Sequence, residues 1–320
     1  MDTSSPKHYL SVAVLIKTKF FDSLKEWFLW NKFIGVDHFY MVDNGCEPSL
    51  EDFFKNFSED ITFVPNNVID SSYKVQSLIY QDIYKKYKNE SKWMAFIDDD
   101  EYIISPLEYS FLDFLKTIED KRGLEINWRL FSPEGWWAHE GREWHNKTFI
   151  LDRYKKYYAH RCVKTIINCT KVEEIETGGA VHRLVSHGAV NCFGEQVEPF
   201  TETKKEWCRL IKDERTLSYS NRSQIEYPTF AINHYSLKSW EEIEYKLKER
   251  GFAQGERDLK SLGKDSTMYR CEKILKMLFQ FTQQNNHLRR NEFNKFFFKK
   301  ETAKTREEFL DFFNSQKHRF

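Results

Sequence analysis

Short apolar runs alternate with longer segments of helical spacing along the first hundred residues. Four continuous apolar runs are typical of strands buried on both faces: residues 10–16, 38–42, 61–64 and 93–97. Between them lie three segments that we expect to be helical: residues 21–33, 50–57 and 75–87. Regular alternation of strands and helices predicts an α/β fold, with a mainly parallel sheet flanked by helices.

The pattern is looser after residue 120. Short strands are expected over residues 124–131, 148–151, 163–167 and 230–232. A helix is expected over residues 239–250, because Ser239 can cap its start, Glu242 follows three residues later, and Gly251 can end it.

We expect one large domain over residues 1–255 and a C-terminal extension over residues 256–320. The change in pattern divides the domain into two halves, residues 1–120 and residues 121–255. The extension is basic and rich in phenylalanine, with helical spacing from about residue 268. It can pack on the domain, form a contact between two copies of the chain, or lie on an anionic membrane surface.

Composition narrows the class of protein. Lys and Arg together number 49, as do Asp and Glu, so the net charge is zero and no overall positive field favours nucleic acid as a partner. No apolar run approaches the roughly 18 residues that a membrane helix needs. The 6 cysteines include no CxxC pair, which is typical of reduced thiols in a cytoplasmic protein. The aromatic fraction of 17% suits flat apolar surfaces, in the core or against a sugar ring.

Polar residues follow three of the predicted strands. They are Lys17, Asp43 with Asn44, and the acidic run from Asp98 to Glu101. Ligands of parallel sheets bind beyond the carboxyl ends of the strands, so these groups are expected to share one crevice. A solvated turn is the alternative for the acidic run.

Within the acidic run, Asp98 and Asp100 have the D-x-D spacing that lets two carboxylates hold one hard cation, and Asp99 and Glu101 form the alternate pair. Such a cation, Mn²⁺ or Mg²⁺, would bind a diphosphate. As a Lewis acid it would stabilise the negative charge that develops when the diphosphate leaves.

Two sequence blocks, well separated along the chain, resemble bacterial GT-A glycosyltransferases of the family-2-like and family-92-like (DUF23) groups. The first comprises KEW at residues 25–27, GVDHFYMVDN at 35–44 and WMAFIDDDEYI at 93–103. The second is HYSLKSWEEIEYKLKERG at 234–251. The resemblance covers about residues 10–255.

This resemblance implies a GT-A fold and a metal-dependent, inverting transferase. It implies that residues 1–120 form the nucleotide-sugar-binding half of the domain and residues 121–255 the acceptor half. It implies that Asp98 and Asp100 are the D-x-D pair and that His234 is a further metal or diphosphate contact. It also implies donor contacts from Asp43 to the nucleoside and from two basic groups, Lys238 and Arg250, to the diphosphate. The family's Lys-Asn-Glu turn is replaced here by Lys17, Thr18 and Lys19, and Lys17 is assigned to the donor side.

An inverting transferase needs a base for the acceptor hydroxyl. Glu134 is the first candidate because it lies between a predicted strand and a Gly-Trp-Trp turn, and the alternatives are Glu140 and Glu195. Trp136 and Trp137 can stack on the acceptor sugar or belong to the core. In the acidic run, Asp99 is assigned to the donor side and Glu101 to the acceptor side.

The sequence therefore predicts a cytoplasmic glycosyltransferase that builds a bacterial surface glycan such as lipopolysaccharide or capsule. A peripheral position on the inner face of the membrane is an option for it. A UDP-hexose, with galactose or glucose, is the expected donor, and a glycan or glycolipid is the expected acceptor. Two alternatives remain open at this point. One is a sugar-phosphate nucleotidyltransferase, although no Gly-rich phosphate loop follows the first strand. The other is a non-catalytic glycan- or metal-binding module.

Overall fold

The computed structural model describes most of the N-terminal half of the chain and several separate segments of the rest. The described residues are 5–66, 73–104, 109–132, 148–149, 163–175, 182–185, 187–197, 230–235, 240–246, 249 and 300–320.

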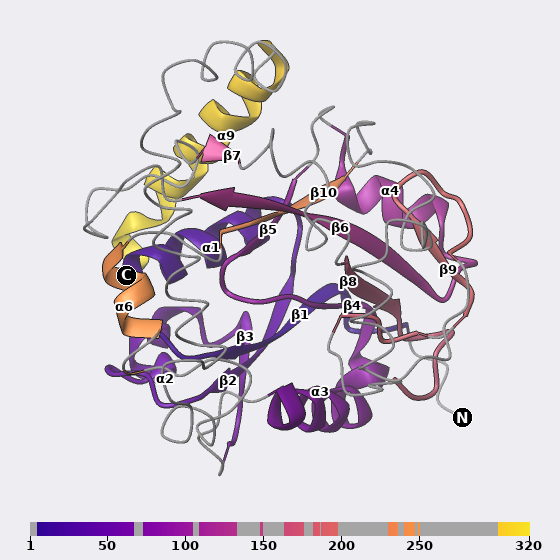
Figure 1. The fold of residues 1–320 in the computed structure, drawn as a ribbon, viewed down its shortest axis with the longest axis horizontal. Helices are drawn as coiled ribbons and strands as arrows, with labels where there is room; N and C mark the ends of the chain where they lie inside the picture. Colours follow the sequence, from indigo (N-terminus) through magenta and orange to yellow (C-terminus); the bar gives the residue numbers. More distant parts are fainter. Residues whose placement is uncertain are drawn as a thin grey trace, which may run out of the picture.

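Strands and helices alternate through the first part of the fold (Figure 1). The elements are β1 (His8–Ile16), α1 (Phe21–Phe33), β2 (His38–Asp43), α2 (Leu50–Phe53), β3 (Ile61–Val64), α3 (Tyr73–Tyr87) and β4 (Ser91–Phe96). The four strands pair with one another in parallel, in the order β3-β2-β1-β4. The α/β fold class and the parallel sheet expected from the sequence are confirmed. The second expected helix is shorter than predicted, because a 3-10 turn over Lys55–Phe57 follows α2.

The remaining strands extend this sheet with mixed directions. The elements are β5 (Glu101–Ile104), α4 (Phe111–Thr117), β6 (Gly123–Ser132), β7 (Thr148–Phe149), β8 (Val163–Asn168), β9 (Ala189–Asn191), β10 (Ala231–His234) and α6 (Trp240–Tyr245). The full order is β3-β2-β1-β4-β8-β6-β10-β5, with β8 antiparallel to both neighbours, and β7 and β9 also pair with β6. The sequence pattern predicted β6, β7, β8 and β10, but it did not predict β5, α4 or β9.

The two faces of β1 pack against different helices. Val12 and Val14 belong to a cluster that includes Trp27 of α1. Their neighbours Ala13 and Leu15 belong to a second cluster, which includes side chains of α3. Successive side chains of a strand point to opposite faces, so a continuous apolar run is what a strand covered on both sides requires.

The described part of the C-terminal extension packs on the domain. Helix α9 (Lys300–Gln316) lies on α1, where Phe309 contacts the rings of Trp30 and Phe33 at centroid distances of 5.1 Å and 5.5 Å. Further along, Phe320 packs among aromatic rings of α1, α2 and the following turn: Phe28, Phe53, Phe54 and Phe57. The phenylalanines of this segment are therefore used in packing within the chain.

Among the residues that the structure describes, no helix combines the length and the apolar character needed to cross a membrane.

Two histidines stack where β1 and β2 begin, at the end of the sheet opposite the acidic run. The rings of His8 and His38 lie 4.1 Å apart at 12°, and His38 Nε2 is 2.8 Å from Thr62 Oγ1. Burial lowers the pKa of both imidazoles and brings that of His38 to about 4. The charged groups around the pair are of both signs: Lys7, Lys32, Asp37, Asp60 and Glu90.

This pair should make the fold less stable in acid. Because the folded-state pKa of His38 is depressed, the unfolded chain binds the proton more readily, and stability is lost as the pH falls from about 6.5 through 4. The contribution of His38 to this loss is roughly 2–3 kcal/mol. Denaturant unfolding between pH 7 and pH 4 should show a smaller loss for His38→Gln than for the control His318→Gln, which alters an exposed histidine. Equal losses in the two variants would contradict the prediction.

Candidate active site

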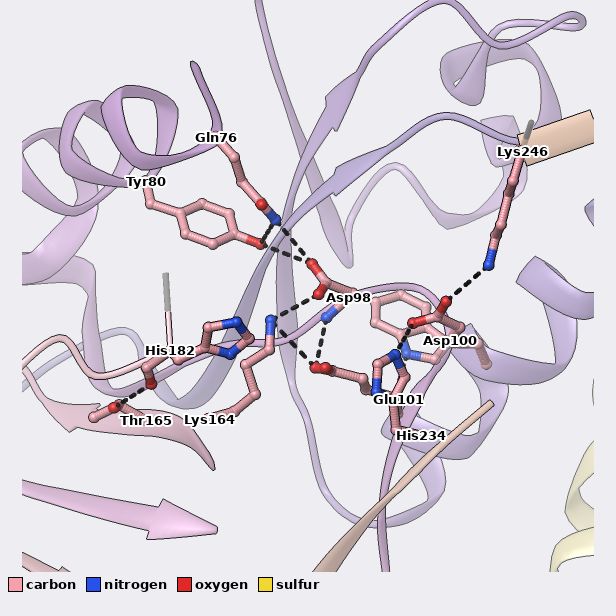
Figure 2. A network of polar contacts seen from close by, with 11 residues as sticks. Gln76, Tyr80, Asp98, Asp100, Glu101, Lys164, Thr165, His182, His234 and Lys246 are labelled. Carbon is pink, nitrogen blue, oxygen red and sulfur yellow. Dashed lines mark hydrogen bonds and ion pairs between the residues drawn. The ribbon is translucent and has the colours of Figure 1, made fainter. Parts of the chain in front are cut away.

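The acidic run forms a tight turn between β4 and β5 (Figure 2). The backbone N–H of Glu101 donates to the carbonyl of Asp98 at 3.1 Å, and the N–H of Asp98 donates to Glu101 Oε2 at 3.0 Å. From α1, Trp27 Nε1 donates to the carbonyl of Glu101 at 2.9 Å. Asp99, Asp100 and Glu101 are all buried, so this segment is not a solvated turn.

Asp98 is held by donors from two other elements. Lys164 Nζ of β8 lies 2.7 Å from Asp98 Oδ2. On the other oxygen, Gln76 Nε2 donates at 2.9 Å and Tyr80 Oη at 3.5 Å, both from α3. Burial opposes ionisation of Asp98, but Lys164 outweighs it, so the pKa of this carboxyl is lowered. Asp98 is therefore an oriented carboxylate whose charge is balanced within the protein.

Lys164 also serves the acid at the start of β5. Its Nζ lies 3.5 Å from Glu101 Oε2, and both side chains are fully buried. Burial raises the pKa of Glu101 well above its usual range, with Lys164 acting in the opposite direction. Burial acts to lower the pKa of Lys164, but Asp98 and Glu101 more than compensate and raise it, so the ammonium stays charged.

The pairing of β10 with β5 brings His234 to the acidic run. His234 lies directly opposite Glu101 in the antiparallel register, and its Nε2 is 3.3 Å from Asp100 Oδ1. The ring of Trp128, from β6, lies against the imidazole with centroids 4.2 Å apart. The other oxygen of Asp100 accepts from Lys246 Nζ, just after α6, at 3.1 Å.

Three of these side chains can hold a metal ion. One ligand atom each from Asp100, Glu101 and His234 lies within 4.8 Å of the others. Glu101 Oε1 and His234 Nδ1 are buried and have no hydrogen-bond partner among the described residues. The carboxylate oxygen Glu101 Oε1 is therefore an unused acceptor. Two carboxylates and an imidazole suit a divalent cation. The second member of the predicted D-x-D pair, Asp100, belongs to this cluster, whereas Asp98 is bound to Lys164.

Two further predicted donor residues lie in the described structure. The carboxylate of Asp43 accepts backbone N–H groups from Gly45, Cys46 and Leu50 at 2.8–2.9 Å, so it shapes the turn after β2 and the start of α2. Lys17 follows β1 directly and is partly exposed. A nucleoside contact by Asp43 and a donor contact by Lys17 remain predictions.

Other sequence candidates lie outside the described residues. They are Glu134, Glu140, Trp136, Trp137, Lys238 and Arg250. Glu195, the remaining alternative base, is described, and its Oε2 accepts from Asn191 Nδ2 at 3.0 Å in the turn after β9.

Sequence reasoning missed two lysines and a histidine. Lys164 lies within the apolar strand β8, where a charged residue is rarely buried unless it is paired, and this position was the available signal. Lys246 lies four residues after Glu242 on the predicted helix and faces the same side. The resemblance pointed instead to Lys238 and Arg250 as the basic groups of the site. His182 packs edge-on against Trp128, and burial lowers its pKa to about 3. In the sequence His182 lies in a loop flanked by glycines, where a structural role was preferred to a place on the acceptor side.

Comparison with solved structures gives only weak similarities. The TarS 1-349 crystal structure from S. aureus has a TM-score of 0.32 and 13% identity, over 51% of this chain and 47% of TarS 1-349. The galactosyltransferase LgtC, in complex with donor and acceptor sugar analogues, has a TM-score of 0.29 and 12% identity, over 70% of this chain and 86% of LgtC. The chain thus spans about half the length of the TarS structure that it matches.

The curated proteins include no match to the chain. The sequence profile of Glycosyltransferase family 92 matches residues 8–192, which run from the first residue of β1 past the end of β9. This match covers more than half of the chain and contains the acidic run and Lys164. It confirms the resemblance seen in the sequence, and the chain belongs to glycosyltransferase family 92.

Proposed function

We propose that the chain is a metal-dependent, inverting glycosyltransferase that moves a hexose from a UDP-sugar to a sugar hydroxyl of a bacterial surface glycan. One observation carries the proposal: in a chain that belongs to family 92, Asp100, Glu101 and His234 converge beyond the carboxyl end of β4. Galactose or glucose is the proposed sugar, and lipopolysaccharide or capsule is the proposed product. We place the reaction in the cytoplasm.

In this proposal the acidic run binds the donor through a cation. Asp100 and His234, with Glu101 beside them, would hold Mn²⁺ or Mg²⁺, which when bound supplies a Lewis acid for the departing diphosphate. Asp98, fixed by Lys164, would present its partly exposed carboxylate to the donor, with Asp99 next to it.

The remaining roles fall on residues named from the sequence. Lys238 and Arg250 would contact the diphosphate, and Lys17 and Asp43 the nucleotide. Trp136 and Trp137 would stack on the acceptor. The Glu134 carboxylate would accept the proton of the attacking hydroxyl, as general-base catalysis requires.

Donor hydrolysis in the absence of an acceptor tests this proposal. The purified chain is incubated with UDP-galactose, UDP-glucose or GDP-mannose, with Mn²⁺, Mg²⁺ or EDTA, and release of the nucleotide is measured. We expect slow hydrolysis of a UDP-hexose that requires a divalent cation. A nucleoside triphosphate and a sugar phosphate are assayed in parallel for nucleotidyl transfer. Absence of turnover, together with no thermal shift from any nucleotide sugar, would rule out the transferase.

A further inference from the structure

Lys246 occupies one oxygen of the carboxylate proposed to bind the cation (Figure 2). Its Nζ lies 3.1 Å from Asp100 Oδ2 and 3.4 Å from Glu242 Oε1, and its side chain is only 10% exposed. His234 takes the other oxygen of Asp100, at 3.3 Å. The carboxylate of Asp100 therefore lies between an ammonium group and an imidazole.

An ammonium group and a divalent cation compete for the same carboxylate. A bound Mg²⁺ lies about 2.0–2.1 Å from its oxygen ligand, which would place it within a few ångströms of Lys246 Nζ. Two charges of like sign that lie a few ångströms apart repel each other far more strongly in a buried site than in water, and the double charge of the cation doubles this repulsion. This repulsion opposes the binding of Lys246 and of the cation to the Asp100 carboxylate at the same time.

We propose that Lys246 is an internal competitor of the divalent cation at Asp100, so that cation binding displaces its ammonium group and releases the segment that carries it. This inference rests on the proposed metal role of Asp100. It makes the affinity of the site depend on a residue that is not itself a ligand.

The attachments of this segment are compatible with release. Helix α6 has only 6 residues, and its described contacts outside the site include the ring of Tyr245, which meets Phe20 edge-on at 5.6 Å and lies 4.8 Å from Lys19 Nζ. The ion pair between Lys19 and Glu249 spans 3.2 Å, with side chains 43% and 57% exposed, and such surface pairs contribute little. Glu242 lies one helical turn before Lys246 and can keep the displaced ammonium group paired.

Binding of Mn²⁺ alone, followed by the loss of the free-ion electron paramagnetic resonance signal, tests the proposal. Lys246→Met keeps the length of the side chain and removes the charge, so it should lower the Kd for Mn²⁺ about tenfold or more. Lys19→Met is the matched control, because it loosens the same segment but leaves the ammonium group on Asp100. The control should stay within about twofold of the original protein.

The outcomes separate this inference from the proposed function. Unchanged or weaker Mn²⁺ binding by folded Lys246→Met overturns the competition and leaves the metal site standing. Absence of Mn²⁺ binding in the original protein and in both variants overturns the competition and the metal role together.

A second measurement on the unaltered chain keeps the test decisive if Lys246→Met does not fold. Acylation of Lys246, measured by mass spectrometry, should increase several-fold when Mn²⁺ is added, because the ammonium group leaves a buried pair. Labelling of the fully buried Lys164 serves as the internal reference and should not change. Equal labelling of Lys246 with and without Mn²⁺ overturns the proposal.

Discussion

Replacement of Lys164 by methionine is expected to lower the free energy of unfolding by about 3–5 kcal/mol, since removing one partner of a buried ion pair leaves an uncompensated charge. Lys164 is fully buried and is the cation that Asp98 and Glu101 share. Methionine fills a similar volume, so the loss would report the missing charge and not a cavity. Urea unfolding followed by circular dichroism measures the effect.

Two controls show whether the charge is responsible. Lys116→Met removes an exposed lysine from its pair with Asp113 and should cost less than about 1 kcal/mol. Adding Asp98→Asn to Lys164→Met should restore part of the lost stability, because the two effects are coupled through one contact. If the free energy of unfolding of Lys164→Met lies within about 1 kcal/mol of that of the original chain, the stability of the buried network does not depend on this lysine.

Asp100→Asn should reduce metal-dependent donor turnover by about a thousandfold or more, because a catalytic cation contributes several kcal/mol to the transition state. Asparagine has the same shape but carries no negative charge for the cation. The Mn²⁺ affinity measured without donor should fall in the same variant. Steady-state donor hydrolysis and Mn²⁺ titration provide the two readouts.

The control for Asp100→Asn is a similar change far from the site. Asp113→Asn alters an acid on α4 that is 70% exposed and pairs only locally with Lys116, so turnover should be unchanged. Turnover of Asp100→Asn within about tenfold of the original protein would remove Asp100 from the proposed ligand set.

The parallel half of the fold could be predicted because its strands are buried on both faces. Continuous apolar runs such as residues 10–16 are unambiguous, and the helices between them have clear spacing. Strand β5 was missed because it has only 4 residues and begins with the acid Glu101, so it carries no period that a sequence pattern could reveal. Its pairing with β10 is a long-range contact that no local pattern encodes.

The acidic residues of the candidate site could be predicted from the sequence, but the basic residues that pair with each of them could not. Asp98 and Asp100 follow β4 and His234 is the last residue of β10, and strand ends are where ligand groups of such sheets are expected. Which acid faces a lysine and which faces a histidine depends on the antiparallel placement of β8 and β10. That placement brings Lys164 to Asp98 and His234 to Asp100.

The packing of α9 has a consequence for the order in which the chain can fold. Asn56 and Arg319, which exchange hydrogen bonds, are 263 positions apart, and Phe320 fills a site built by residues of the first sixty. During synthesis, the N-terminal sheet emerges long before the segment that covers α1. The aromatic side chains of α1 and α2 therefore stay exposed to chaperones or to neighbouring chains until α9 has been synthesised and has packed on them.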